Sequence, residues 1–320
     1  MVYFLFILWF VFLIKWADVL VDWASSIAKK FKVSDLVIWL TIVAVWTSAP
    51  ELVVNIMASI KWSAGIAIWN VLGSNISNIL LILWISAIIY PIAVKKATTF
   101  KEIPFSLLAV VVLWFVANDA IIDWANFSWI TRIDGLVLLS FFAIFMYYVF
   151  GISKTEKDLV EEVHVKKMSL WMSIFFICLG LVWLTLGWQW IVNGAIHIAG
   201  IFNMNETIIG LTIVAVWTSL PELATCVVAA LKKKSDIAIW NIVWSNIFNI
   251  FWILWLSAVI NPLPFDIGLD RDILMTIFAT ILLFVFVLIW RKSSTIVRIE
   301  WIIMLVIYIT YVTLLVMGVI

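Results

Sequence analysis

Two nearly identical phrases decide the fold of this chain: LTIVAVWTSAPEL at residues 40–52 and LTIVAVWTSLPEL at residues 211–223. Each is followed by a second shared phrase, IWNVLGSNISNI at 68–79 and IWNIVWSNIFNI at 239–250. The offset between the copies is 171 residues throughout, and roughly 31 of the 52 aligned positions are identical. The chain therefore contains an internal repeat, and both copies place hydroxyls, amides and one glutamate within strongly apolar sequence.

The composition indicates a membrane protein. The chain is 66% hydrophobic and 12% charged, with a mean hydropathy of +1.19, well above the apolar share of soluble domains. Because a helix of about 20 mostly apolar residues spans a bilayer, we predict an all-α protein with ten transmembrane helices, at residues 2–28, 33–60, 65–91, 102–121, 129–151, 169–199, 204–231, 237–261, 272–290 and 299–319. The net charge of +1 gives no indication of a nucleic-acid partner, and no obligate protein partner is expected.

The basic residues predict how these helices are oriented. Sixteen of the 20 Lys and Arg residues fall in alternate loops, namely Lys29, Lys30, Lys32, Lys95, Lys96, Lys101, Lys154, Lys157, Lys166, Lys167, Lys232, Lys233, Lys234, Arg291, Lys292 and Arg298. The positive-inside rule makes these loops cytoplasmic and puts both termini outside the cell membrane. Since each half holds an odd number of spans, we predict two inverted five-helix repeats, 1–151 and 169–320, joined by a short cytoplasmic loop at 152–168.

Proline is expected to break the second and seventh helices. Pro50 lacks an N–H and clashes with the carbonyl one turn earlier, so carbonyls near Ala44 and Trp46 should leave the helical hydrogen-bond ladder. Within a membrane, such backbone is tolerated only where it lines a cavity or contacts protein. Thr47 and Glu51 are four residues apart and therefore share the face of these carbonyls. The second copy supplies the equivalent set: Ala215, Thr218, Ser219, Pro221 and Glu222.

The polar residues of the repeat favour a hard cation as ligand. Intramembrane acids are costly and mark functional sites, and repeated broken helices are the best sequence pointer to a transporter site. The third and eighth helices add Ser74 with Asn78 and Ser245 with Asn249, again four residues apart. All these ligands are oxygens, which Ca²⁺ binds six to eight at a time, whereas Mg²⁺ dehydrates reluctantly. The charge of −2 on two glutamates would be neutralised by one Ca²⁺.

Two other classes of protein fit the sequence less well. A channel selectivity ring would not need two inverted copies of a broken helix. An intramembrane hydrolase would need a nucleophile with its base or a metal motif such as H-E-x-x-H, and neither is found. With no phosphate-binding loop in the sequence, we expect a non-enzymatic transporter without a cofactor, driven by an ion gradient.

The paired motifs resemble the sodium/calcium exchanger family of the cation/calcium antiporter superfamily. Its inverted repeats carry G-T-S-x-P-E and G-N-x-x-G-S-N-x-x-[ND], which stand here as WTSAPE (46–51) with WNVLGSNISN (69–78), and WTSLPE (217–222) with WNIVWSNIFN (240–249). The resemblance implies antiport of Na⁺ for Ca²⁺ in a lipid bilayer by alternating access. It also implies twelve ion ligands: Ala44, Thr47, Ser48, Glu51, Ser74, Asn78, Ala215, Thr218, Ser219, Glu222, Ser245 and Asn249.

The resemblance also bears on gating and on the coupling ion. It implies that the first and sixth helices, 2–28 and 169–199, slide across the other helices to switch access. Proton-coupled relatives carry a further Glu at the position of Gly73 or Trp244, and neither copy has it. The alternatives left open are an H⁺/Ca²⁺ antiporter and a Na⁺ exchanger for another divalent cation.

Tryptophan is unusually frequent, with 22 Trp against 11 Gly, although glycine is the residue that membrane helices favour. Four aligned pairs exchange one for the other: Trp16 with Gly187, Trp23 with Gly194, Trp39 with Gly210, and Gly73 with Trp244. The four departures from the family motifs, Trp46, Trp69, Trp217 and Trp240, are also Trp where the family has Gly, and we expect them to crowd the ligand cluster, where bulk is least tolerable. We hypothesise that most of these residues are glycines whose UGA codons were translated as Trp. The alternative, genuine tryptophans at membrane interfaces, suits a few positions such as Trp190.

Overall fold

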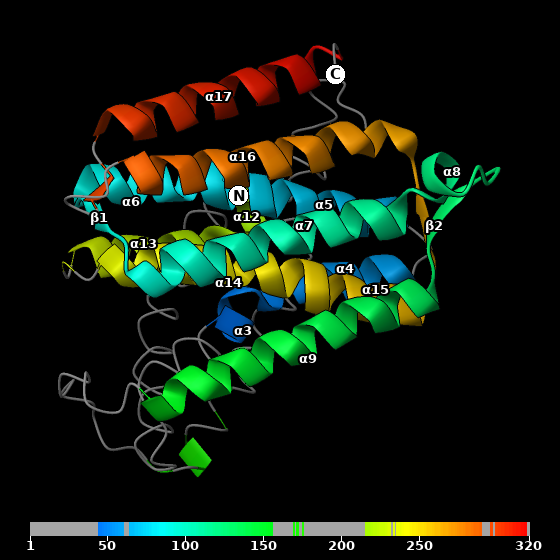
Figure 1. Ribbon diagram of the computed structural model, residues 1–320, viewed down its shortest axis with the longest axis horizontal. Helices are drawn as coiled ribbons and strands as arrows, with labels where there is room; N and C mark the ends of the chain where they lie inside the picture. The colour runs from blue at the N-terminus through cyan, green and yellow to red at the C-terminus, as the bar shows by residue number, and fades with distance from the viewer. Residues whose placement is uncertain are drawn as a thin grey trace, which may run out of the picture.

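The structure is a computed structural model that describes residues 44–60, 64–155, 169, 171–172, 175, 215–231, 233, 235–289, 295–296 and 298–318. Almost all of these residues are helical (Figure 1). The predicted first helix lies outside the described residues, as do nearly all of the predicted sixth helix and residues 156–168 of the predicted loop. Residues 152–155, also assigned to that loop, continue the helix before it. The predictions made for those segments, including the sliding of the first and sixth helices, stay predictions.

Five described helices are long and apolar enough to cross a membrane: Gly65–Ile89, Thr98–Ala117, Arg132–Gly151, Ala238–Ile260 and Ile267–Ile289. They correspond to the third, fourth, fifth, eighth and ninth predicted spans. Three shorter apolar helices, Ala49–Ile60, Leu220–Leu231 and Ile302–Val316, fall within the second, seventh and tenth. The protein is thus a helical, multi-span membrane protein.

The first copy of the repeat and the segments after it form α3 (Ala44–Thr47), α4 (Ala49–Ile60), α5 (Ala64–Ser77), η2 (Asn78–Ile82), α6 (Leu83–Ile89), η3 (Thr98–Glu102), α7 (Ile103–Ala117), α8 (Asp119–Ile122) and α9 (Arg132–Thr155). The second copy and its sequel form α12 (Ala215–Thr218), α13 (Leu220–Leu231), α14 (Ser235–Phe248), η5 (Asn249–Ile253), α15 (Leu254–Ile260), η6 (Ile267–Leu269), α16 (Asp270–Ile289) and α17 (Arg298–Val316). The segments η2, η3 and η5 are π-helical. π-helical turns are rare in proteins overall, and those that occur are often found at functional sites.

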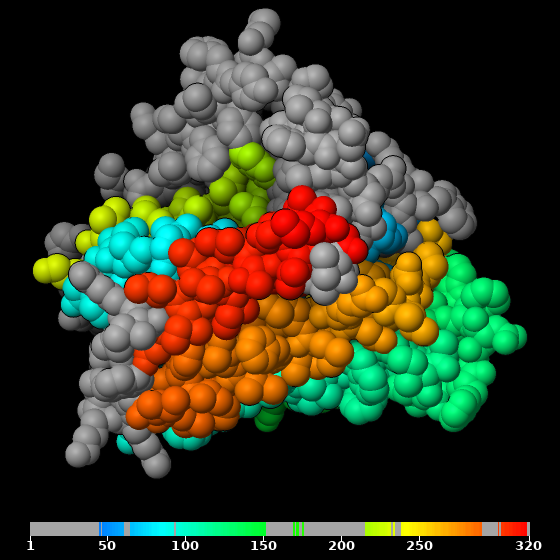
Figure 2. All heavy atoms as spheres, turned by 90° about the horizontal axis from the view of Figure 1, so that it is seen from above, coloured from blue at the N-terminus to red at the C-terminus, as the bar shows by residue number. Residues whose placement is uncertain are grey.

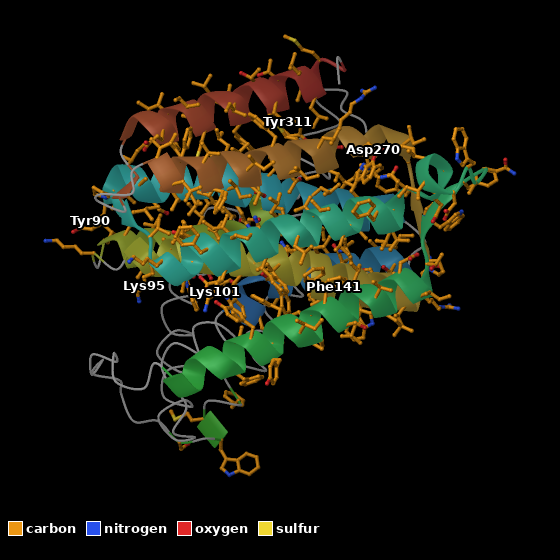
Figure 3. The ribbon with its side chains drawn as sticks, in the orientation of Figure 1. Tyr90, Lys95, Lys101, Phe141, Asp270 and Tyr311 are labelled. Carbon is orange, nitrogen blue, oxygen red and sulfur yellow. The ribbon has the colours of Figure 1, made fainter. Side chains whose placement is uncertain are left out.

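Two short antiparallel ribbons tie loops together at opposite ends of the helices. β1 (Ile92–Ala93) pairs with β4 (Thr295–Ile296), and β2 (Ser128–Ile130) pairs with β3 (Leu263–Phe265). The β1 end carries Lys95 and Lys101, whereas Asp270 lies at the β2 end (Figure 3). The ribbons are a small departure from the all-α prediction, and they group the loops as the alternation of spans requires.

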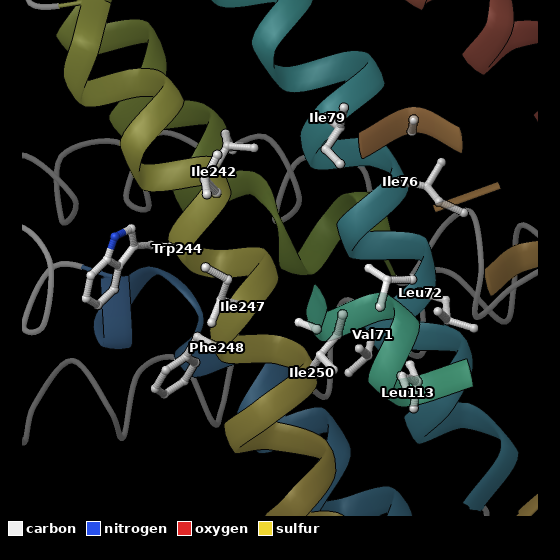
Figure 4. Packing of buried hydrophobic residues seen from close by; sticks show 14 of the residues in the cluster. Val71, Leu72, Ile76, Ile79, Leu113, Ile242, Trp244, Ile247, Phe248 and Ile250 are labelled. Carbon is white, nitrogen blue, oxygen red and sulfur yellow. The ribbon is translucent and has the colours of Figure 1, made fainter. Parts of the chain in front are cut away.

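The core surrounds α5 and α14, which carry Asn70, Ser74, Asn75 and Ser77, and Asn241, Ser245 and Asn246, among the buried polar residues. Apolar side chains such as Val71 and Leu72 on α5, and Ile242 and Ile247 on α14, fill the space around them (Figure 4). The outer helices behave differently. α16 and α17 lie along one face of the molecule (Figure 2), and α16 exposes apolar residues at helical spacing, Leu274, Phe278, Ile281 and Val285. An exposed apolar stripe of this kind suits contact with lipid.

Candidate ion-binding site

Both broken helices are interrupted at equivalent serines. α3 ends at Thr47 and α4 begins at Ala49, and the second copy breaks in the same way around Ser219. The prolines that follow, Pro50 and Pro221, cannot donate to the turn before them. The predicted interruption of the second and seventh helices is therefore present in both copies.

One expectation about the break is wrong. The Ala215 carbonyl does not leave the helical ladder, because it accepts a hydrogen bond from the Ser219 N–H at 3.2 Å. Its oxygen also lies within hydrogen-bonding distance of the Thr218 hydroxyl, at 3.2 Å, and of the Ser74 hydroxyl, at 3.4 Å. A carbonyl oxygen has two lone pairs, so this one can accept from one of the two hydroxyls while it keeps its backbone hydrogen bond.

The two glutamates are held by hydroxyls from both copies of the repeat. Glu51 Oε1 accepts from Ser219 Oγ at 3.1 Å and from Ser74 Oγ at 3.5 Å. Glu222 Oε1 accepts from Ser48 Oγ at 2.9 Å and from Ser245 Oγ at 3.1 Å. Each contact has its counterpart at the 171-residue offset. Reciprocal contacts of this kind are the mark of two-fold symmetry, so an approximate two-fold axis relates the copies at this site.

Four asparagines extend this symmetry across α5 and α14. Asn75 Nδ2 donates to the Asn246 backbone carbonyl at 3.2 Å, and Asn246 Nδ2 donates to the Asn75 carbonyl at 3.3 Å. Asn78 Nδ2 donates to Asn246 Oδ1 at 3.0 Å, and Asn249 Nδ2 donates to Asn75 Oδ1 at 3.1 Å. The four bonds join the two helices into one unit.

Four buried oxygens in this cluster accept no hydrogen bond from any residue that the structure describes: Glu51 Oε2, Glu222 Oε2, Asn78 Oδ1 and Asn249 Oδ1. Leaving a buried acceptor unsatisfied costs roughly 1–3 kcal/mol, and more if it is charged. Native structures therefore avoid such groups unless something else binds them. The four form two symmetric pairs of oxygen donors, which is the ligand type that a hard cation requires.

The structure brings the predicted site residues together in the interior. Ten of them are buried: Thr47, Ser48, Glu51, Ser74, Asn78, Thr218, Ser219, Glu222, Ser245 and Asn249. Ala215 is buried beside them, and Ala44 begins α3 as Ala215 begins α12. Their burial and proximity agree with the predicted cluster, and their role as ion ligands stays a prediction.

The sequence reasoning missed several asparagines of the cluster. Asn70 donates to Asn55 Oδ1 at 2.8 Å, and its own Oδ1 accepts from the Thr218 hydroxyl at 3.2 Å. Asn75 and Asn246 were missed as well, although a signal was present. Asn70 and Asn75 align with asparagines in the second copy, Asn241 and Asn246. Polar residues that occur in both copies, whatever their spacing, therefore point to these positions.

Trp240 and Trp244 of the second copy stack on one another along α14. Trp244 is buried, its ring lies 4.5 Å from that of Phe145, and it points away from α5 (Figure 4). Trp240 donates its indole N–H to Thr98 Oγ1. The expectation that Trp240 crowds the ligand cluster is therefore wrong, because this indole lies against η3.

Other indoles bury a polar group at a cost. The indole N–H groups of Trp84, Trp244 and Trp255 are buried and donate to no residue that the structure describes. Trp84 and Trp255 are equivalent positions of the repeat. An unpaired buried donor destabilises the folded state, so each of these indole N–H groups carries a cost, and whether these residues are glycines in the cell stays a prediction.

Comparison with known proteins places the chain in a family. The model of the family described as sodium/calcium exchanger protein matches residues 1–151 and 172–317. The putative antiporter CaxA of Alkalimonas amylolytica is 36% identical over 309 residues, covering 94% of each chain. The sodium/calcium exchanger MaX1 of Methanosarcina acetivorans is 30% identical, covering 79% of this chain and 81% of the relative.

A solved structure agrees with this result. The sodium-calcium exchanger NCX_Mj, in crystals soaked with Na⁺ and Sr²⁺, matches with a TM-score of 0.71 and 31% sequence identity. The match covers 98% of this chain and 99% of that chain. The internal repeat, the broken helices and these similarities have one explanation: the chain belongs to the sodium/calcium exchanger family.

Proposed function

We propose that this protein exchanges Na⁺ for Ca²⁺ across a cell membrane, at one site shared by two inverted repeats. The observation that carries the proposal is the set of four buried, unpaired oxygens contributed equally by the two copies. Family membership supports the same conclusion, as does the similarity to MaX1 and NCX_Mj, both sodium/calcium exchangers.

Ca²⁺ would be held chiefly by Glu51 and Glu222. Their two carboxylates carry a charge of −2, and each has an unpaired Oε2 atom. The unpaired Oδ1 atoms of Asn78 and Asn249 add two neutral oxygens. The remaining coordination would come from the nearby hydroxyls and carbonyls: Thr47, Ser48, Ser74, Thr218, Ser219, Ser245, Ala44 and Ala215. Six to eight oxygens in flexible geometry suit Ca²⁺, and the same oxygens could hold Na⁺ ions instead, so the two cations would compete.

Alternating access would follow from the symmetry of the repeats. We propose that residues 1–151 and 169–320 are inverted five-helix repeats, that loop 152–168 is cytoplasmic and that both termini lie outside. A site on a two-fold axis in the membrane plane is equally placed with respect to both sides, so one site can release ions to either. The first and sixth helices, 2–28 and 169–199, would slide to switch access, as in transporters built from inverted repeats.

Coupling to protons is the main alternative, along with exchange of Na⁺ for a divalent cation other than Ca²⁺. The position equivalent to Gly73 and Trp244 carries no carboxylate in either copy, and the buried acids of the cluster are Glu51 and Glu222. No observation on the described residues favours either alternative over Na⁺/Ca²⁺ exchange.

The test is ion flux in proteoliposomes that contain the purified protein. Vesicles loaded with Na⁺ and diluted into Na⁺-free buffer should take up ⁴⁵Ca²⁺, and vesicles with equal Na⁺ on both sides should not. Imposing a proton gradient without a Na⁺ gradient should give no uptake. Uptake driven by protons alone, or by Na⁺ with Mn²⁺ but not Ca²⁺, would overturn the proposal in favour of one of the alternatives.

A further inference from the structure

Asn75 and Asn246 do not contribute to the set of unpaired oxygens, yet both are completely or almost completely buried at the two-fold axis. Each donates through Nδ2 to the backbone carbonyl of the other and accepts through Oδ1 from an asparagine of the opposite repeat. Every polar atom of these two side chains is therefore used within the protein. The side chains that they contact by hydrogen bonds are those of Asn78 and Asn249.

We propose that Asn75 and Asn246 are positioning residues that fix the amide orientation of Asn249 and Asn78, so that each presents its oxygen, and not its NH₂ group, to the cation. This inference rests on the proposed function, because it assumes that Asn78 and Asn249 are ligands of the transported ion. An asparagine side chain has an oxygen and an NH₂ group of nearly the same shape, and only the oxygen can bind a cation.

The orientation follows from the backbone. A backbone carbonyl only accepts hydrogen bonds, so the Asn75 atom that faces the Asn246 carbonyl must be Nδ2. The other end of Asn75 is then Oδ1, which requires a donor, and Asn249 supplies its Nδ2 there. The oxygen of Asn249 is left over, and it is one of the four buried, unpaired oxygens.

The same sequence of contacts holds on the other side of the axis. Asn246 Nδ2 faces the Asn75 carbonyl, its Oδ1 accepts from Asn78 Nδ2, and Asn78 Oδ1 is left unpaired. Two backbone carbonyls thus set the orientation of four amides. Because each carbonyl belongs to the opposite repeat, the two amide ligands are correctly oriented only when α5 and α14 are packed together.

The π-helical turns fit this arrangement. η2 begins at Asn78 and η5 begins at Asn249, so each ligand lies where its helix widens. Three residues before it on the same helix lies the asparagine that orients the ligand of the opposite repeat. Contacts that orient the ligands of a metal ion typically affect its affinity about 10- to 100-fold.

The test compares Asn75→Ala in two backgrounds. In the wild-type background, Asn249 loses the acceptor that holds its NH₂ group, so Asn75→Ala should weaken Ca²⁺ binding about 10- to 100-fold. In an Asn249→Asp background both side-chain atoms are oxygens, and no wrong orientation exists. There, Asn75→Ala should change the dissociation constant far less. Asn246→Ala with Asn78→Asp should behave in the same way.

Calorimetric titration of Ca²⁺ into purified, Na⁺-free protein gives the dissociation constant without transport, and the KM of ⁴⁵Ca²⁺ uptake should follow it more closely than the maximal rate does. The matched control is Asn118→Ala. Asn118 is a buried amide bonded to the Trp114 carbonyl and to Asp270, away from the cluster, and its removal should leave the Ca²⁺ dissociation constant unchanged.

Three results separate the possible failures. If Asn75→Ala weakens Ca²⁺ binding by the same factor in both backgrounds, the residue is only structural and the inference is wrong. An unchanged dissociation constant in the wild-type background would also overturn it. If Asn249→Ala and Asn78→Ala leave Ca²⁺ affinity unchanged, the ligand assignment in the proposed function fails instead. Should Asn75→Ala not fold, Asn75→Leu, which keeps the shape and removes both polar atoms, takes its place in both backgrounds.

Discussion

The two copies of the repeat are equivalent at the ion site and differ one helical turn away from it. At the centre, the contacts of Glu51 are matched by those of Glu222. One turn further along, the first copy has Asn55 where the second has Cys226. Symmetry is therefore kept where both halves must contact the same ion. It is relaxed where a side chain supports only its own half.

The relaxed position shows what a substitution of this kind changes. Asn70 donates to Asn55 Oδ1 at 2.8 Å, whereas the equivalent Asn241 donates to Cys226 Sγ at 3.7 Å. Asn70 Oδ1 accepts from Thr218, but Asn241 Oδ1 accepts no hydrogen bond from the described residues. The second copy thus has the weaker amide network behind an equivalent ion cluster.

The largest expected effect breaks the central symmetry. Replacing Glu51 or Glu222 with Gln lowers the site charge from −2 to −1 and replaces one carboxylate oxygen with an NH₂ group that cannot bind a cation. Either change should abolish Na⁺-dependent ⁴⁵Ca²⁺ uptake, and the two should be about equally severe because the glutamates are equivalent. Glu300→Gln, at a buried glutamate in α17, is the control and should keep transport close to wild type.

If one of the two glutamate variants transports fully while the other variant is inactive, one copy of the repeat alone binds the ion. A correctly folded protein must be demonstrated for each by a monodisperse peak in size-exclusion chromatography. The symmetric account requires the same loss from both changes.

The next largest effect concerns the tryptophans, which differ between the copies at Gly73 and Trp244. Overpacking costs roughly 1–3 kcal/mol per site, against a total stability of about 5–15 kcal/mol for an ordinary domain. The chain with Trp at positions 16, 23, 39, 46, 69, 217, 240 and 244 should aggregate or show no ⁴⁵Ca²⁺ flux. The chain with glycine at these eight positions should transport.

Equal transport by both chains would show that these indoles are tolerated. The source DNA offers a second check, because UGG codons at positions 16, 23, 39 and 244 would end the recoding hypothesis. Trp244 is the most informative single position, since its indole N–H is buried and donates to no described residue. If position 244 is glycine in the cell, Trp244→Gly alone should raise the thermal unfolding temperature, whereas loss of a genuine, packed indole should lower it.

Inversion of the repeats predicts which side of the membrane each loop faces. Single cysteines at Lys157 and Lys233 should react with an impermeant thiol reagent only from the cytoplasm, and one at Asn126 only from outside. Lys233 and Asn126 are exposed in the structure; Lys157 lies outside the described residues. Labelling of Lys233 and Asn126 from the same side would contradict both the number of spans and the inversion.

The smallest effect exchanges the residues at the relaxed position. Cys226→Asn would give the second copy the amide contact of the first, and a net gain of about 0.5–1.5 kcal/mol is expected for one better hydrogen bond. Asn55→Cys should cost a similar amount. Reversible thermal unfolding measures both, and the KM for Ca²⁺ should not change. A large change in that KM would mean that this position also contacts the ion.

Much of the fold could be predicted because the bilayer constrains it so strongly. The spans predicted at 65–91, 129–151 and 237–261 from length and hydropathy are helices at 65–89, 132–151 and 238–260. The breaks before Pro50 and Pro221 followed from proline chemistry. The pattern of polar residues indicated the face on which Glu51 and Glu222 lie. These are local properties of the sequence, and each can be recognised because it occurs in both copies of the repeat.

What the sequence could not show depends on contacts across the two-fold axis. Spacing along one helix does not reveal that Asn75 contacts Asn246, because the two residues are 171 positions apart in the sequence. Nor does it show that the Ala215 carbonyl keeps its backbone bond, or that the Trp240 indole turns toward Thr98. The hydrogen-bond partners and side-chain rotamers of these residues are determined by packing between helices.

The most direct test of a single shared site is the number of Ca²⁺ ions that the purified protein binds. Calorimetric titration in Na⁺-free buffer should give one high-affinity Ca²⁺ per chain, because both glutamates serve the same ion. Adding Na⁺ should weaken that binding competitively, and Glu51→Gln or Glu222→Gln should each remove it entirely. Two independent Ca²⁺ ions per chain, each lost with only one of the glutamates, would contradict the account.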